Sequence, residues 1–335
     1  MPRLRRSDCS DPGLSRRRRG RGFEYRDPGG DPVRDPETLE RVRELAIPPA
    51  WSDVWVCPDP LGHLQATGVD AAGRRQYLYH PSWRAHRDRR KFEAMVDFGR
   101  ALPRVRRAVA RDLGRESLDR ERVLACAVRL LDRGLFRIGS DSYASENGSY
   151  GLTTILKRHV QAGDGTLRFD YPAKAGIRRV QLIADADAGE VVSALKHRRG
   201  GSSRLLAYRG SRRWHDLHAE DVNEYLRDVS RQDCTAKEFR TWNGTVLAVA
   251  GLARREPHIR PTRAARERAI RAVTREVAEH LGNTPAVARR AYIDPRVLDR
   301  FRSGWRLELA SIDPGDIGTG RERRRLERAV LELLG

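Results

Sequence analysis

From about residue 86 onward, apolar residues recur at the three- and four-residue spacing that is typical of amphipathic helices. The segment ERVLACAVRLLDRG (121–134) shows this spacing, and Gly134 is placed to cap its end. The predicted buried face of this segment consists of Val123, Leu124, Ala127, Val128 and Leu131. A helix packed against a core is therefore predicted here.

The segment TRAARERAIRAVTREVAEHLG (262–282) predicts a second long helix. Thr262 is expected to cap its start, and Gly282 is expected to cap its end. Its predicted buried stripe consists of Ile270, Val273, Val277 and Leu281. Together with the preceding segment, this pattern predicts that the C-terminal two thirds of the chain are mainly helical.

Residues 23 to about 85 follow a different pattern. The stretch DPETLERVRELAIPPAW (35–51) predicts a short helix that the Pro-Pro pair ends. After it, Val54 and Val56 alternate with Trp55, which is the two-residue period of a strand. Turn-forming stretches follow at PDPLG (58–62) and DAAGR (70–74). These residues are predicted to form a small strand-rich domain.

One more strand pattern interrupts the helical region. In TLRFDY (166–171) the predicted inward side chains are Leu167, Phe169 and Tyr171. GDG (163–165) precedes this stretch and PAKAG (172–176) follows it, and both are typical of hairpin tips. A small hairpin sheet is therefore expected inside the helical domain.

These patterns predict an α+β fold with a small strand-rich N-terminal domain at 23–85 and a larger, mainly α catalytic domain at 90–335. A linker is expected near residues 80–92. Residues 1–22 contain SRRRRGRG and almost no apolar side chains, so a disordered basic arm is expected there. Either a loose phosphate-binding tail or a simple solvated extension fits this arm. No apolar run approaches the roughly 18 residues of a membrane span, and no secretory signal is expected.

Charge adds a partner to this picture. Lys and Arg total 66 against 46 Asp and Glu, which gives a net charge of +20. Arginine forms forked hydrogen bonds to phosphate oxygens, so this excess indicates a nucleic-acid partner. A GC-rich genome explains the preference for Arg over Lys, but it does not explain the net excess of cations. The alternative of a membrane partner is not expected.

The sequence argues against metal and nucleotide chemistry. The cysteines are far apart and form no C-x-x-C pair, which predicts neither zinc nor disulfides and fits a reducing, cytoplasmic location. There is no H-E-x-x-H, no G-x-x-x-x-G-K-[ST] and no G-x-G-x-x-G between a strand and a helix. DADAGE (185–190) fits a helix start better than a calcium loop. No metal site and no cofactor are therefore expected.

The remaining candidates are basic residues in ordered contexts and one tyrosine. Arg137 follows a helical stretch, and Lys174 lies in the turn PAKAG. Arg240 lies in the opening turns of TAKEFRTWNGT (235–245), whose Thr and Glu form a predicted capping box. Tyr292 closes the segment GNTPAVARRAYIDP (282–295). Taken singly, each has an ordinary structural explanation, such as a surface ion pair, a solvated turn or a packed ring.

Taken together, these stretches resemble the type IB DNA topoisomerases of the small, poxvirus-like bacterial branch. The resemblance covers roughly residues 23–315, with the segments in the family's order and spacing. GRRQYLYH (73–80) is similar to the DNA-contacting strand of the N-terminal domain. RIGSDSYASENGSYGLTTILKRHV (137–160), DYPAKAGIRRV (170–180) and the two segments quoted above are similar to the segments that carry the catalytic residues.

The resemblance implies a role for each matching residue. Tyr292 matches the nucleophile, Arg137 and Arg240 match the arginines that bind the scissile phosphate, and Lys174 matches the general acid. Asn283 stands where many members carry a histidine; an asparagine amide can still donate to a phosphate oxygen, but it brings no charge. The positions that match DNA-contacting residues are Gln76, Tyr77, Tyr79, Tyr143 and Lys237.

The reaction implied by the resemblance is relaxation of supercoiled double-stranded DNA by nicking and religation of one strand. It proceeds through a 3′-phosphotyrosyl intermediate and needs neither ATP nor metal. A monomer that closes as a C-shaped clamp around the duplex is expected, located in the cytoplasm with the nucleoid. The alternatives are a tyrosine recombinase and a non-catalytic DNA-compacting protein. A recombinase would normally show H-x-x-R where this chain has KEFR (237–240).

Overall fold

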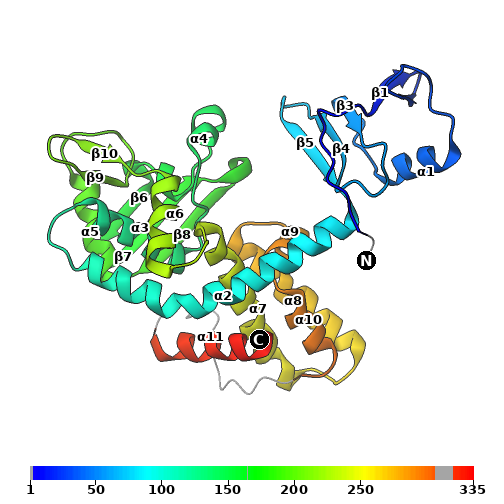
Figure 1. Cartoon of the computed structure of the whole chain (residues 1–335). Coiled ribbons are helices and arrows are strands. Elements are labelled where there is room, and N and C mark those ends of the chain that lie inside the picture. The colour runs from blue at the N-terminus through cyan, green and yellow to red at the C-terminus, as the bar shows by residue number, and fades with distance from the viewer. Residues whose placement is uncertain (1–2, 164, 306–319) are drawn as a thin grey trace. The chain divides into compact units, whose positions relative to one another are not determined.

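The computed structural model describes residues 3–163, 165–305 and 320–335, except for the side chain of Tyr143. The chain divides into two compact units, residues 1–92 and 93–335 (Figure 1). The first unit is rich in strands and the second is mainly helical, so the predicted α+β class is confirmed.

The N-terminal unit is built on a five-stranded antiparallel sheet with the strand order β2-β1-β3-β4-β5. Its elements are β1 (Leu14–Arg19), β2 (Gly22–Arg26), α1 (Pro36–Glu44), β3 (Ser52–Val56), β4 (Leu64–Val69) and β5 (Arg75–Tyr79). The carboxylate of Asp35 caps α1 by accepting a hydrogen bond from the Thr38 amide. Val42 of this helix packs against Val54 and Val56 of β3, which are buried, and the strand predicted from their alternation with Trp55 is present.

The prediction of a disordered arm at 1–22 is wrong for the residues that the structure describes. The second half of this segment belongs to the sheet, because β1 and β2 form a hairpin whose turn places Gly20 at φ +56°. Leu14 is buried, and the Arg16 guanidinium stacks 4.1 Å from the centroid of the Phe23 ring. The aliphatic stems of arginines can cover a sheet in place of apolar residues, so hydrophobic patterning misses such a strand.

The two units meet within one helix, α2 (Pro81–Leu113). The boundary falls after Phe92, so the linker expected near 80–92 is helical and the second unit starts at Glu93.

The C-terminal unit carries the remaining elements. Its helices are α3 (Arg120–Gly134), α4 (Asp141–Asn147), α5 (Ala186–His197), α6 (Ala219–Ser230), α7 (Ala236–Arg255), α8 (Arg263–Leu281), α9 (Pro285–Ala291), α10 (Pro295–Arg302) and α11 (Gly320–Leu334). Single 3-10 turns are η1 (Leu152–Thr154), η2 (Lys157–His159), η3 (Lys174–Gly176) and η4 (Glu256–His258). Its strands are β6 (Val160–Gly163), β7 (Thr166–Pro172), β8 (Arg178–Ala184), β9 (Ala207–Arg209) and β10 (Trp214–Asp216).

The predicted apolar stripes form the core of this unit. All five residues predicted on α3 and all four predicted on α8 are buried. The Thr262 hydroxyl accepts a hydrogen bond from the Ala265 amide, and Gly282 ends α8 with φ +59°, as predicted. The expected hairpin sheet has the order β6-β7-β8, and Leu167, Phe169 and Tyr171 of β7 are buried.

The end of α3 differs from the prediction. Gly134 is the last helical residue, and the left-handed cap is Leu135 at φ +55°. A Cβ atom at position 134 would lie 2.3 Å from the Phe136 ring and 2.6 Å from Ile183. Close packing against Phe136 and β8 therefore requires glycine at position 134. The left-handed cap is Leu135, and this conformation is strained for a leucine.

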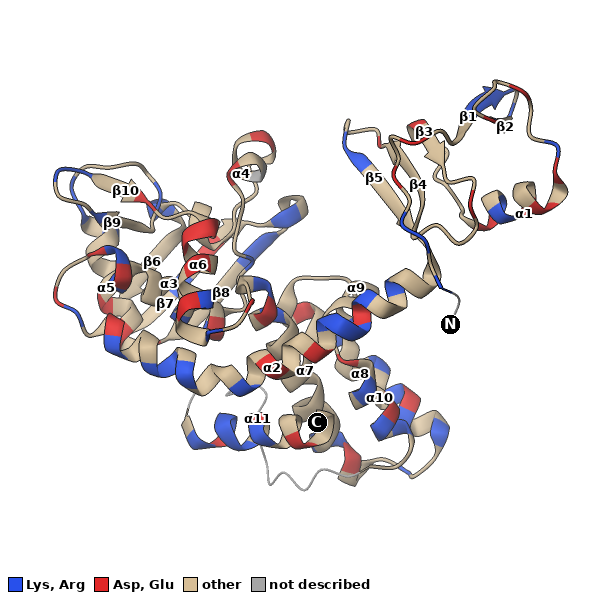
Figure 2. Cartoon of the chain, in the orientation of Figure 1, with Lys and Arg blue, Asp and Glu red and all other residues tan. Residues whose placement is uncertain are grey.

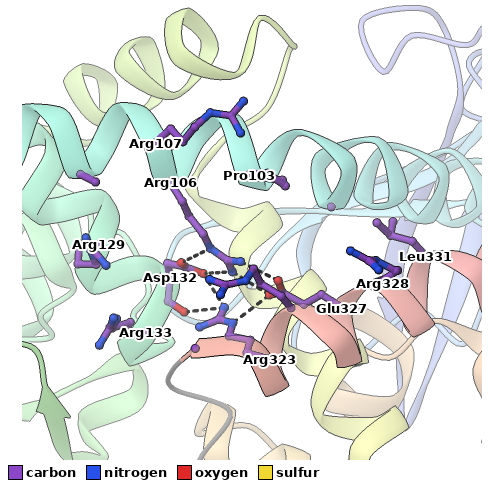
Figure 3. Close-up of a pocket in the computed structure, with 14 residues that line it drawn as sticks. Pro103, Arg106, Arg107, Arg129, Asp132, Arg133, Arg323, Glu327, Arg328 and Leu331 are labelled. Atoms are coloured by element: carbon purple, nitrogen blue, oxygen red, sulfur yellow. Dashed lines mark hydrogen bonds and ion pairs between the residues drawn. The ribbon is translucent and has the colours of Figure 1, made fainter. Parts of the chain in front are cut away.

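Four charged side chains form a cluster between α2, α3 and α11 (Figure 3), in which Asp132, Arg323 and Glu327 are buried and Arg106 is partly exposed. Arg106 donates to Asp132 at 2.8 and 3.0 Å and to Glu327 at 2.6 and 2.7 Å. Arg323 donates to the same two carboxylates at 2.6 and 2.9 Å and to Asn243 of α7 at 3.0 Å. The cluster therefore fastens α11 to the helices that form the centre of the unit.

We expect Asp132→Asn to lower the free energy of unfolding by about 3–5 kcal/mol, because it leaves Arg106 and Arg323 with only one of the two carboxylates that they share. Burial would raise the pKa of Asp132, but Arg323 and Arg106 outweigh burial and lower it. A lowered folded-state pKa stabilises the fold above the unfolded value near 4 and loses this effect as the pH falls. Urea unfolding at pH 7 and in acid measures both effects.

The matched control for this variant is Asp97→Asn. Asp97 also pairs with an arginine, Arg100, at 3.2 Å, but its side chain is 61% exposed. Exposed pairs contribute less than about 1 kcal/mol. Equal losses of stability in the two variants would show that the ion cluster contributes no more to the free energy of unfolding than an exposed ion pair does.

Candidate active site

Arg240 is the most enclosed of the predicted site residues, with an exposed fraction of 3%. It lies on the second turn of α7, which begins with the predicted capping box between Thr235 and Glu238. Its Nη2 donates to the main-chain carbonyl of Leu281 at 2.7 Å, and its Nη1 donates to the carbonyl of Leu135. Burial, and after it the charge of Arg137, lowers the pKa of Arg240 to about 10. The strained cap at the end of α3 thus supplies an acceptor to this side chain.

Arg137 follows that cap by two residues and reaches the end of α8. Its Nη2 donates to the carbonyl of Gly282 at 3.3 Å and to the side-chain oxygen of Asn283. The sequence predicts that Arg137 and Arg240 belong to one site. In the structure Arg240 binds the main-chain carbonyl of Leu281, and Arg137 binds that of the next residue, Gly282.

A third arginine, Arg179 of β8, binds the same helix end, and the sequence did not single it out. It donates to the carbonyls of Glu279 at 3.0 Å and His280 at 2.7 Å. The last four carbonyls of a helix lack partners within the helix and carry its negative dipole end, so cations are favoured there. Three guanidinium groups therefore converge on the C-terminal end of α8. The sequence offered one indication of this contact, the pair of arginines in IRRV (177–180). The second arginine of the pair is Arg179, which binds the end of α8.

Tyr292 follows α9, which begins at the Thr284 cap with Pro285 in its first turn, as predicted. Its main-chain amide donates to Ala288, and its carbonyl accepts a hydrogen bond of 3.3 Å from the Thr245 hydroxyl. A Cβ atom on Gly244 would lie 2.6 Å from this carbonyl. The close approach of α7 thus fixes the main chain of Tyr292 one turn away from Arg240.

The half-buried ring of Tyr292 lies against the Arg240 guanidinium, whose Cζ is 5.1 Å from the ring centroid. Burial would raise the pKa of Tyr292, but the charge and hydrogen bonding of Arg240 outweigh it. The charges of Arg137 and Lys237 act in the same direction, so the pKa of Tyr292 is lowered from its usual value near 10. A tyrosine whose phenolate is stabilised by arginines is activated as a nucleophile.

Asn283 lies between these groups. Its side-chain oxygen accepts the hydrogen bond from Arg137, and its Nδ2 is enclosed without a hydrogen-bond partner among the described residues. The sequence led us to expect only a donor to phosphate at this position. In the structure the amide also orients Arg137, and one donor remains available.

Lys174 is not brought into contact with Tyr292 in the structure. It is exposed in η3, the turn between β7 and β8, where Ala175 has φ +64° and Gly176 has φ +70°. Among the described residues it forms no hydrogen bond or ion pair. Lys237 is exposed on the first turn of α7, and Tyr143 lies in α4, although its side chain is outside the described part of the structure.

Sequence models of two families match the chain. One, described as bacterial DNA topoisomerase IB, N-terminal domain, matches residues 22–70. The other, described as eukaryotic DNA topoisomerase I, catalytic core, matches residues 80–303, which is well over half of the chain. The chain belongs to the type IB DNA topoisomerases. This assignment makes it an enzyme of DNA topology, and the matches do not favour the recombinase or the DNA-compacting alternative.

Named relatives agree with this family. The DNA topoisomerase 1B of Acanthamoeba polyphaga mimivirus is 27% identical over 289 residues, which cover 83% of this chain and 84% of the relative. The DNA topoisomerase 1B of Vaccinia virus (strain Copenhagen) is 21% identical over 286 residues, which cover 84% and 88%. The match to a bacterial N-terminal domain indicates the bacterial branch of the type IB topoisomerases.

The N-terminal unit of this topoisomerase carries the other predicted DNA contacts on β5. Tyr77 and Tyr79 have their rings stacked 6.3 Å apart, and Tyr77 is 47% exposed. Gln76 precedes Tyr77 on the strand and donates to Asp70 at 2.9 Å. Strand β5 therefore places the two tyrosine rings side by side, and a hydrogen bond ties Gln76 to the turn that precedes the strand. Figure 2 shows Lys and Arg on this strand and on the three-stranded sheet of the other unit.

The described residues contain no group of three or more His, Cys, Asp or Glu side chains arranged to hold a metal ion. Within the same residues, no helix has both the length and the apolar character needed to cross a bilayer. The four cysteines are free thiols.

Proposed function

We propose that this chain relaxes supercoiled double-stranded DNA by cutting and rejoining one strand. The Tyr292 oxygen gives its proton to water and attacks phosphorus, so that a bond from this oxygen to phosphorus forms. The bond from phosphorus to the 5′-oxygen breaks, and that oxygen takes a proton. The product is a 3′-phosphotyrosyl linkage and a free 5′-hydroxyl, and reversal of the same step rejoins the strand. The phosphotyrosyl linkage retains the energy of the broken phosphodiester bond, so religation needs no ATP, and the guanidinium groups take the role that a metal would have.

The observation that carries this proposal is the packing of the Tyr292 ring on the buried Arg240 guanidinium, 5.1 Å from Cζ to centroid. Arg240 stabilises the phenolate before attack, and Arg137 is near enough to lower the pKa of Tyr292 as well. Fixed positive groups also stabilise the charge that develops on the phosphate oxygens in the transition state. The free Nδ2 of Asn283 supplies a neutral donor to one of these oxygens.

Lys174 is proposed as the general acid that protonates the 5′-oxygen. Its turn projects from the three-stranded sheet, and no partner within the described residues holds its amine, so the side chain is free to swing toward bound DNA. We further propose that the chain acts as a monomeric, C-shaped clamp on the nucleoid DNA of the cytoplasm. In this proposal Gln76, Tyr77 and Tyr79 contact the duplex from the N-terminal unit, and Tyr143 and Lys237 contact it from the C-terminal unit.

The deciding experiment is relaxation of supercoiled plasmid by the wild-type chain in EDTA without ATP. We expect complete relaxation, and detergent added during the reaction should trap protein on the 3′ end of the nicked strand. Trapping on a 5′ end, or relaxation that requires Mg²⁺ or ATP, would contradict the proposal. Binding and compaction without relaxation would favour the DNA-compacting alternative.

Lys174→Ala should slow cleavage of a normal strand by about 10²–10⁴-fold, which is the usual contribution of a general acid. A substrate with sulfur in place of the 5′-oxygen has a leaving group that needs no proton, so it should restore most of the lost rate. Single-turnover cleavage of both substrates by wild type and variant measures this. If the sulfur substrate is slowed equally, Lys174 is not the general acid.

A further inference from the structure

A cavity of about 650 Å³ opens beside the buried ion cluster of the C-terminal unit (Figure 3). It lies among α2, α3 and α11, and every residue that lines it belongs to this one unit. It is distinct from the candidate active site, because none of its lining residues is among the predicted catalytic or DNA-contacting residues. Its volume falls within the range of about 300–1,000 Å³ that is typical of small-molecule sites.

The lining is strongly cationic. Seven arginines line the cavity together with two acidic residues, Asp132 and Glu327. Both carboxylates are already bound by Arg106 and Arg323, so these four charges balance among themselves. The cations left over are Arg107, Arg129, Arg133, Arg324 and Arg328.

Two of these remaining arginines are compensated by carboxylates, and three are not. Arg129 and Arg133 share Asp185 at 3.8 and 3.0 Å, and Arg129 also lies 3.9 Å from Asp187. Arg107, Arg324 and Arg328 have no hydrogen bond or ion pair with the part of the chain that the structure describes. Unpaired guanidinium groups that line one open cavity can bind anions with several oxygens, because each fork can hold two of them.

We propose that this cavity binds a compact polyphosphate anion, a chain of two or more phosphate groups that is either free or carried by a nucleotide. Arg107 on α2 and the pair Arg324 and Arg328 on α11 line the same cavity, so a short chain of phosphates that extends across it would offer oxygens to both helices. Duplex DNA is a poor fit, since specific DNA interfaces cover about 1,000–2,500 Å² of open surface. The bound anion bridges α2 and α11 and therefore stabilises the docking of α11. This proposal does not depend on the topoisomerase reaction.

Thermal unfolding at constant ionic strength tests the site, with tripolyphosphate, pyrophosphate, monophosphate and ATP as probes. The test variant is Arg324→Gln/Arg328→Gln, and the control is Arg271→Gln/Arg275→Gln, which removes two exposed arginines at the same spacing on α8. We expect tripolyphosphate to raise Tm in wild type and control. The test variant should bind it at least about tenfold more weakly. A second test variant, Arg107→Gln, removes a contact from α2 and covers the case in which the α11 variant does not fold.

The probes separate the sources of the ligand. Equal effects of ATP and tripolyphosphate indicate a free polyphosphate, and a larger effect of ATP indicates a nucleotide. An equal rise in Tm for all variants would place the anion elsewhere on this basic protein and overturn the proposal. Monophosphate acting as strongly as tripolyphosphate would also overturn it.

A separate observation concerns Arg179, and the inference drawn from it rests on the proposed function. Arg179 lies on β8, five residues after Lys174, and holds two carbonyls at the end of α8. Its Nη1 would lie 2.9 Å from a Cβ at Gly282, so it packs directly against the residue before Asn283. It is the described side chain that ties the strand after the Lys174 turn to this helix end. We infer that Arg179 is a positioning residue that sets the place of Lys174 relative to the nucleophile segment.

Arg179→Ala should therefore slow cleavage of a normal strand by about 10–100-fold, and the sulfur-substituted strand should recover most of that loss. Arg179→Lys should keep more activity, because one ammonium can still hold one carbonyl. A role that is only structural would slow both substrates equally, and this result would overturn the inference. If the wild type neither cleaves nor relaxes DNA, the proposed function fails first, and the two failures are distinguishable.

Discussion

Tyr292→Phe is expected to bind DNA as the wild type does and to leave supercoiled plasmid unrelaxed. The substitution removes one oxygen atom and keeps the ring that packs on Arg240. Because that oxygen is the proposed nucleophile, the rate should fall by at least about 10⁴-fold. Plasmid relaxation, DNA affinity and thermal stability of the variant measure the three parts of this prediction.

The matched control is Tyr208→Phe. Tyr208 is a partly buried tyrosine of β9 whose ring stacks 5.3 Å from His215. Loss of its hydroxyl should leave relaxation unchanged. Residual covalent protein–DNA complex in Tyr292→Phe would show that another residue attacks the phosphate.

Arg240→Gln should reduce the cleavage rate by about 10²–10³-fold, the usual cost of removing one group that stabilises transition-state charge. The effect should also depend on pH. Arg240 holds the pKa of Tyr292 below its usual value, so the rate of the wild type should rise with pH and level off below pH 10. Without the positive charge the phenolate is less stable, and the rising part of the profile should move to higher pH.

Single-turnover cleavage between pH 6 and 10 measures both effects. Arg254→Gln is the control, because Arg254 lies in the last turn of the same helix and is 44% exposed. Arg240 also binds two main-chain carbonyls, so circular dichroism should confirm that the variant is folded under the assay conditions. An unshifted pH profile would mean that Arg240 does not act through the ionisation of Tyr292.

Hydrophobic periodicity was sufficient to predict those helices and strands that have one apolar face. The stripe of α8, its two caps and the inward residues of β7 all lie where the pattern places them. These elements were predictable because burial selects apolar residues at the period of the backbone. The hairpin of β1 and β2 was not, since its surface is covered by arginine stems such as that of Arg16.

The cap of α3 was missed for a related reason. A glycine near a helix end usually supplies the left-handed residue, yet Gly134 serves contact with Phe136 and Ile183. Only the neighbouring sheet, which is distant in sequence, distinguishes these two uses of glycine.

The candidate site could be proposed from the sequence where resemblance to a family marks the residue. Composition and spacing alone left Arg137, Arg240 and Tyr292 with ordinary structural explanations. The structure adds that these three form one interacting group and that Asn283 orients Arg137. Arg179 could not be found from the sequence, because its partners are main-chain carbonyls, which every residue type provides equally.

That last feature bears on how this protein can evolve. The three arginines hold the end of α8 through backbone oxygens at Glu279, His280, Leu281 and Gly282, so the identity of the exposed side chains at 279 and 280 does not enter the contact. Substitutions can accumulate at these two positions without disturbing the chemistry. Gly282 has no such freedom, because its left-handed conformation and its contact with Arg179 exclude a side chain. The arrangement of the candidate active site is thereby insensitive to many substitutions around it.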